Sequence, residues 1–130
     1  MSDFGAVPAA ILSVVDGAYS LGGYRDGFIL YDEIPPDEFP YAMIHSPVKE
    51  RERDDFQHGA ETTANVMLVV FRNETIANVN AAVVTIEAAL DGSTLSGIVE
   101  DTWCSAIGRD EGLDSNFTAA VFQVNTRGSV

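Results

Sequence analysis

Cysteine is almost absent from this chain of 130 residues, in which Cys104 is the only one. A single cysteine cannot form a disulfide within the chain, which agrees with a reducing compartment. The chain has 2 histidines, His45 and His58, and no second cysteine beside them, so we expect no metal site and no cofactor. Cys104 follows Trp103 in an apolar run, which favours a small buried side chain over a nucleophile.

Positive charge is scarce as well, with 7 basic residues against 20 acidic ones and a net charge of −13. Such a surface repels a phosphate backbone, so we expect no specific nucleic-acid binding, although a wall past which DNA slides should not grip it. No apolar run approaches the roughly 20 residues that cross a bilayer. The N-terminal stretch has an acid where a signal peptide has basic residues, so we expect a cytoplasmic product without a membrane partner.

The short motifs of the common enzyme classes are missing. The sequence contains no G-x-S-x-G, P-loop, G-x-G-x-x-G, H-E-x-x-H or C-x-x-C motif. Adjacent acids do occur, and paired carboxylates bind divalent ions or serve as acid and base in glycoside hydrolysis. Neighbouring side chains in a strand point to opposite faces, so we interpret most pairs as solvated surface and expect no enzyme. The pairs are Asp32-Glu33, Asp37-Glu38, Asp54-Asp55, Glu100-Asp101 and Asp110-Glu111.

The length fits one domain over residues 1–130, with 46% apolar and 21% charged residues. Apolar residues at helical spacing predict helices over 7–20 and 76–90, the second with a stripe of Ile76, Val79, Val83, Ile86 and Leu90. Residues 21–27 are predicted as a turn, and 28–41 as a short strand, a proline-interrupted connection and the start of another strand. Further strands are predicted over 41–46, 62–72, 98–107 and 116–125.

This order predicts an α+β fold, with one mainly antiparallel sheet of about four to five strands and two helices packed on one face. Residues 62–72 are apolar on both alternating faces toward their end, which predicts a central strand covered on both sides. The other face and the sheet edges remain to be covered. A monomer could shield its edges with Glu100, Asp101 and Asp110, whereas a ring-forming subunit could pair its edges with neighbours.

The stretch "LYDEIPPDEFPYAMI", residues 30–44, carries Asp32, Pro35, Pro40 and Tyr41 in a strand, aspartate, proline and Phe-Pro-Tyr order. Together with later motifs it resembles the tail terminator (tail completion) proteins of long-tailed bacteriophages and gene transfer agents. The resemblance covers about residues 28–125 and depends on the order and spacing of the motifs.

The second part of this resemblance is "TIANVNAAVVTIEAALDGSTLSG", residues 75–97, a helix that ends in Leu90, Asp91 and Gly92. The family implies a protein of the virion neck, assembled in the host cytoplasm, that forms a hexameric ring on the head-proximal end of the tail tube. Its partners would be other copies of itself, the tail tube protein and the head-completion (stopper) protein, with DNA only passing through the channel. Another neck, connector or tail-tube-like component is the alternative, and an unrelated acidic binding module or enzyme is a third.

A long charged loop or hairpin is predicted at residues 47–60, between two strands. Its charges alternate and nearly cancel, so it is neither a basic arm nor an acidic tail. We predict a contact arm that packs on a neighbouring subunit or on the last ring of the tube, with a solvated loop as the alternative. The contact residues would be Lys49, Glu50, Arg51, Glu52, Arg53, Asp54, Asp55 and, as the apolar anchor, Phe56.

Overall fold

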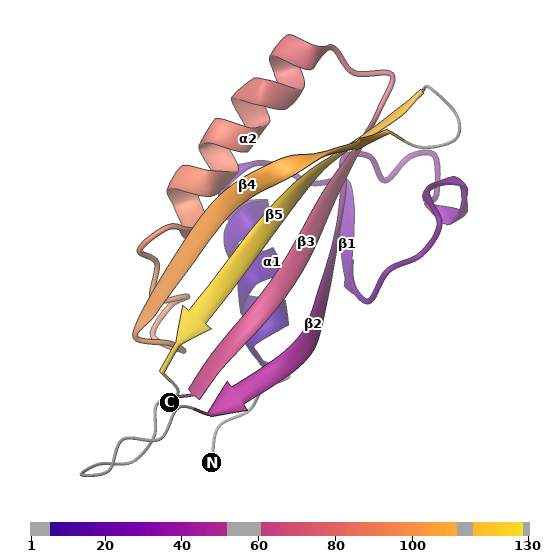
Figure 1. Cartoon of the computed structure of the whole chain (residues 1–130). Coiled ribbons are helices and arrows are strands. Elements are labelled where there is room, and N and C mark those ends of the chain that lie inside the picture. The colour runs from indigo at the N-terminus through magenta and orange to yellow at the C-terminus, as the bar shows by residue number, and fades with distance from the viewer. Residues whose placement is uncertain (1–5, 52–60, 112–115, 129–130) are drawn as a thin grey trace, which may run out of the picture.

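Over residues 6–51, 61–111 and 116–128, the computed structural model contains two α-helices, one short 3₁₀ helix and five strands. Both helices pack on one face of the sheet, which confirms the predicted α+β fold (Figure 1). The helices are α1 (Ala6–Ala18) and α2 (Ile76–Leu90), and the 3₁₀ helix is η1 (Tyr31–Glu33). The strands are β1 (Gly23–Asp26), β2 (Tyr41–Arg51), β3 (Glu61–Arg72), β4 (Asp101–Glu111) and β5 (Phe117–Arg127).

The strands lie in the order β1-β2-β3-β5-β4. β1 pairs with β2 in parallel, and the other three pairs are antiparallel. β3 is therefore the middle strand, as its apolar faces predict. β1 covers only the first four residues of β2, so the rest of β2 and all of β4 form the two outer edges of the sheet.

The prediction for residues 21–33 was wrong in detail. The first strand lies at Gly23–Asp26, inside the predicted turn, and residues 31–33 form η1 where residues 28–41 were predicted to begin with a short strand. Gly22 and Gly23 make this strand possible, because a side chain at Gly22 would collide with the backbone of Glu38. The chain then leaves the sheet at Gly27, whose φ of 102° favours glycine.

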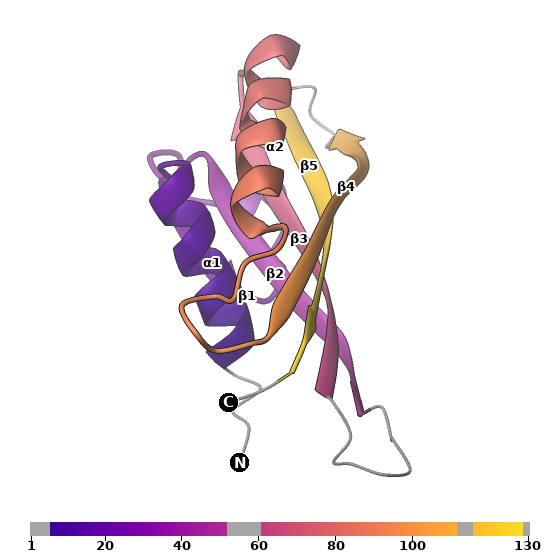
Figure 2. The same cartoon turned by 90° about the vertical axis from the view of Figure 1, so that its left-hand side faces the viewer.

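The main core lies between the sheet and the two helices (Figure 2). α1 contributes Ile11 and Val15, and α2 contributes Ile86 and Leu90, all fully buried against residues such as Phe122 of β5. The predicted stripe of α2 is confirmed at Val79, Ile86 and Leu90, whereas Val83 is partly buried and Ile76 is 67% exposed. Ile76 is the first residue of the helix, directly after the N-cap Thr75.

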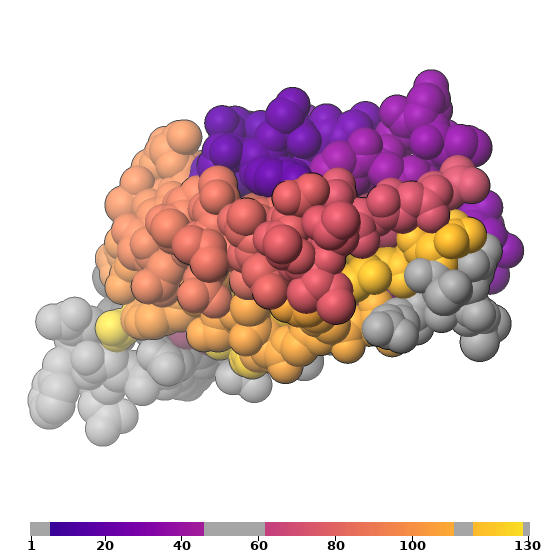
Figure 3. Space-filling view, turned by 90° about the horizontal axis from the view of Figure 1, so that it is seen from above, coloured from indigo at the N-terminus to yellow at the C-terminus, as the bar shows by residue number. Residues whose placement is uncertain are grey.

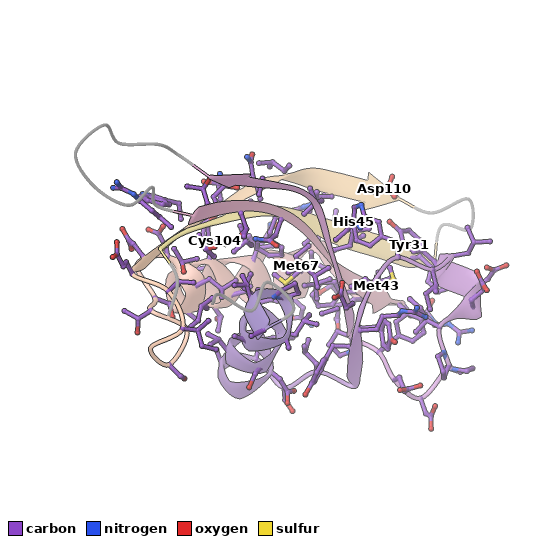
Figure 4. All side chains as sticks on the ribbon, turned by 90° about the horizontal axis from the view of Figure 1, so that it is seen from below. Tyr31, Met43, His45, Met67, Cys104 and Asp110 are labelled. Carbon is purple, nitrogen blue, oxygen red and sulfur yellow. The ribbon has the colours of Figure 1, made fainter. Side chains whose placement is uncertain are left out.

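A second, smaller core lies on the opposite face of the sheet. Residues 27–40, which we call the cover segment, place Ile34 against Tyr41, Met43 and Val70 at one end of that face. The Tyr31 hydroxyl donates a hydrogen bond to the Asp110 carboxylate and so ties the cover segment to β4, as the grouping of labelled side chains in Figure 4 shows. The cover segment does not extend over the rest of this face.

In the described residues, no helix is long and apolar enough to cross a membrane.

Candidate assembly surfaces

Carboxylates from the last turn of α2 and from the residue that follows it occupy the outer edge of β4. Glu87 accepts a hydrogen bond from the Ala106 backbone N–H at 2.8 Å, and Asp91 accepts one from the Cys104 N–H at 3.2 Å. The Gly92 N–H, just past the helix end, donates to the Thr102 carbonyl at 2.7 Å. The chain itself therefore satisfies outward-facing backbone groups along the first half of β4.

This capping is possible because four residues along a helix span nearly the same length as two residues along a strand. α2 and β4 run in opposite directions, so a step toward the end of the helix corresponds to a step back along the strand (Figure 1). Four helical residues rise about 6 Å, and two strand residues rise about 6.6 Å. Glu87 and Asp91 are four residues apart and Ala106 and Cys104 are two apart, so both carboxylates reach their donors at once.

An edge capped in this way cannot readily accept another strand, because its donors already have partners. The sequence suggested Glu100, Asp101 and Asp110 for this role. In the structure Asp101 accepts from the neighbouring Thr102 N–H and Asp110 accepts from Tyr31. The capping carboxylates come instead from Glu87 in α2 and from Asp91, the residue after it, which no local pattern in β4 indicates.

Replacing both Glu87 and Asp91 by alanine should expose this edge. Each lost hydrogen bond should lower the free energy of unfolding by about 1 kcal/mol, since the freed N–H groups regain water. Hydrogen exchange at the Ala106 and Cys104 amides should accelerate, and the protein should self-associate more at high concentration. The matched control is Glu87→Gln with Asp91→Asn, which keeps an oxygen acceptor at each position. Unchanged exchange at both amides in the alanine variant would contradict the capping role.

Below the cover segment, the sheet face opposite the helices is open, and its described residues are uncharged as far as the pair Asp101 and Arg127 at the end of β4 and β5. Trp103 of β4 is 48% exposed there, and Trp103 pairs with Asn125 while Ser105 pairs with Gln123 in the next strand. The Asn125 side-chain oxygen is buried without a hydrogen-bond partner among the described residues. We call this surface the open face; its residues are His45, Ala64, Val66, Trp103, Ser105, Val121, Gln123 and Asn125.

The outward surface of α2 is a second exposed surface without charge. No acidic or basic residue occurs between Glu74 and Glu87, although 21% of the chain is charged. Val84 is 68% exposed on this surface. Seen from above, α2 lies at the surface between α1 and β4 (Figure 3). We call this surface the α2 outer face; its exposed residues are Ala77, Asn80, Ala81, Val84, Thr85 and Ala88.

The predicted contact arm falls largely outside the described residues. The backbone of Lys49, Glu50 and Arg51 continues β2 and pairs with residues 61–63 of β3, so the predicted loop begins as an extended hairpin strand. Residues Glu52, Arg53, Asp54, Asp55 and Phe56 lie outside the described residues. The contact role of the arm stays a prediction.

The family-motif positions at the end of α2, Leu90, Asp91 and Gly92, have structural roles. Leu90 is fully buried in the main core. Asp91 follows the helix and accepts a hydrogen bond from the Cys104 N–H. Gly92 adopts a φ of 79°, which favours glycine.

Of the motif positions around the cover segment, Tyr41 and Pro40 have structural contacts, whereas Asp32 and Pro35 are exposed. Tyr41 is buried in the second core, and the Pro40 carbonyl accepts a hydrogen bond from the Gly22 N–H at 2.8 Å. Asp32 lies exposed in η1, and Pro35 is exposed in the turn that follows.

The residues that could carry chemistry, His45 and Cys104, contact only other parts of the fold in the described part of the chain. There, no group of three or more His, Cys, Asp or Glu side chains could hold a metal ion. His45 is exposed and its ring packs on Phe28 with centroids 5.5 Å apart. Cys104 is buried, as predicted, and burial together with the charges of Glu87 and Asp91 raises its pKa to about 12.

Together these features define an α+β domain with a five-stranded mixed sheet, one helix-covered face and one partly open face. No protein-family model matches the sequence, and no curated protein is similar to it. Among solved structures, the fold is similar to a chain from the virion of a native gene transfer agent particle, with a TM-score of 0.60 and 17% identity. The match covers 95% of this chain and 96% of that chain, so the two share one fold from end to end.

Proposed function

We propose that this chain is a structural protein of a phage-like particle, and specifically the tail terminator that forms a hexameric ring on the head-proximal end of the tail tube. The observation that carries the proposal is the fold shared along 95% of this chain with a virion chain of a gene transfer agent particle. The resemblance of residues 30–44 and 75–97 to tail terminators supports the specific role.

The exposed surfaces support an assembly role. The open face and the α2 outer face lie on opposite sides of the domain, and a ring needs two such different surfaces on each subunit. In this ring the tube protein would bind one end and the stopper protein the other. The net charge of −13 would keep passing DNA from adhering to the protein.

Another neck, connector or tail-tube-like component is the second candidate, because the similarity is to a chain of a whole virion particle and does not specify which part of the particle that chain forms. The two functions predict different assemblies. A tube subunit polymerises into long cylinders by itself, whereas a terminator stops at one closed ring.

Electron microscopy of particles from a producer in which this gene is inactivated tests the proposal. A terminator predicts filled heads without tails alongside overlong tubes, because nothing stops tube growth or offers a docking surface. Loss of all tubes would identify a tube component instead, and normal tails on heads would reject both functions. Restoring the gene on a plasmid should restore tails of uniform length, which controls for effects on neighbouring genes.

A further inference from the structure

We infer that the α2 outer face of one copy covers the open face of a second copy, so that each sheet lies between its own helices and a neighbour's α2. This inference rests on the proposed function for the closed ring, in which it supplies the contact between subunits. The contact uses two different surfaces of the same chain and is therefore heterologous.

The open face has the character of a surface that becomes buried. Val66 and Val121 are only partly covered, and Trp103 is 48% exposed beside them. A sheet with apolar residues on both faces needs a second layer on each. This chain places both of its helices on one side and covers only one end of the other side with residues 27–40. Tryptophan is also the residue type most enriched at the energetic centres of interfaces.

Charge limits where two copies of this chain can meet and favours these two surfaces. Each copy carries −13, so two copies repel one another wherever carboxylates would meet. The residues that make up the open face and the α2 outer face include no Asp, Glu, Lys or Arg. The charges at the end of the open face are Asp101 and Arg127, which have opposite signs and are paired in register, so a neighbour's uncharged helix can lie beside them without burying a lone carboxylate. Alanines on the α2 outer face let a helix backbone come close, and Val84 provides an apolar side chain for the surface around Trp103.

The sheet edges favour contact through faces over contact through strand pairing. Along β4, Glu87 and Asp91 already occupy two outward N–H groups. Along β2, the register shifts between His45 and Val48, and Pro47 within the shift has no N–H to donate. Both edges therefore carry features that discourage an added strand.

A cross-linking experiment tests this contact. In a Cys104→Ala background, which removes the only native cysteine, one version of the chain carries Val84→Cys and the other carries Ser105→Cys. Both substituted positions are exposed, one on each surface. The two versions are co-expressed in a producer that lacks the native gene, and a short bis-maleimide is applied to purified particles and to the purified protein at concentrations where light scattering detects oligomers. We expect dimers that join one version to the other, and none when either version is present alone.

The other possible cross-linking results separate the proposed contact from the proposed function. Cross-linked dimers from the Val84→Cys version alone would show a symmetric contact and overturn the inference. Rings that end tails normally but give no mixed cross-link would also overturn it while leaving the proposed function in place. A mixed cross-link in purified protein, from a chain whose loss leaves tails normal, would support the contact and reject the function. A protein that gives no mixed cross-link in either sample overturns the inference.

A matched pair of substitutions supplies an independent readout. Ala81→Glu places a carboxylate on the α2 outer face, and Ala9→Glu makes the same change at an exposed position of α1. Burying the new charge at residue 81 should raise the dissociation constant between subunits by at least about tenfold, whereas residue 9 should have little effect. Equal weakening by both variants would reflect net charge alone and would contradict the assigned contact.

Discussion

Phe122→Ala is expected to lower the free energy of unfolding by about 3–5 kcal/mol. Phe122 is fully buried on the helix side of β5, where it pairs with Met67 of β3 and Ala106 of β4. Removing the ring leaves a cavity in the middle of the sheet that the neighbouring strands cannot close without breaking their pairing. Since domains of this size are stable by only about 5–15 kcal/mol, the variant should lose a large share of its stability. Urea unfolding followed by far-ultraviolet circular dichroism measures the change.

Gln123→Ala is the control for this experiment. Gln123 is the next residue of the same strand, but it is exposed on the open face. The same measurement, made at concentrations where light scattering detects only monomers, should find a change within about 0.5 kcal/mol of the native protein. A Phe122→Ala variant as stable as Gln123→Ala would mean that the core is not packed around Phe122 as described.

Periodicity predicted the long elements well. The helix over 76–90 and the central strand over 62–72 match α2 and β3 closely, because their apolar spacing reflects the faces that they bury. The start of residues 28–41 misled the prediction because Phe28 and Leu30 are apolar yet 44% and 67% exposed. Composition alone could not show that two glycines upstream allow the close approach that forms β1.

The candidate assembly surfaces were harder to predict. Alternation does place Trp103 and Cys104 on opposite faces of a strand, so burial of the small cysteine already implied an exposed tryptophan. The capping of β4 by Glu87 and Asp91 gave no such signal. It depends on α2 and β4 lying side by side in opposite directions, with partners 19 and 13 residues apart in sequence, and that placement is a property of the packed chain.

The chemistry of Cys104 follows from the same packing and gives the second large effect. Burial, the charge of Glu87 and the charge of Asp91, in that order, raise the thiol pKa from 9.0 to about 12. The thiolate is the reactive form, so at pH 8 a shift of this size lowers its population on the order of 1000-fold. We expect a maleimide or disulfide reagent to label the folded protein at least about 1000-fold more slowly than the urea-unfolded chain. Labelling within tenfold of the unfolded rate would contradict the buried position.

The raised pKa also sets a direction for stability at alkaline pH. Above pH 9 the unfolded chain releases the thiol proton, whereas the folded chain keeps it until about pH 12. The unfolded state therefore binds fewer protons in this window, and unfolding becomes more favourable as the pH rises. Comparison of the native protein with Cys104→Ala isolates this contribution, because the variant lacks the titrating group. Glu87→Gln with Asp91→Asn should lower the thiol pKa and speed labelling, which would link the reactivity of Cys104 to the carboxylates that cap its strand.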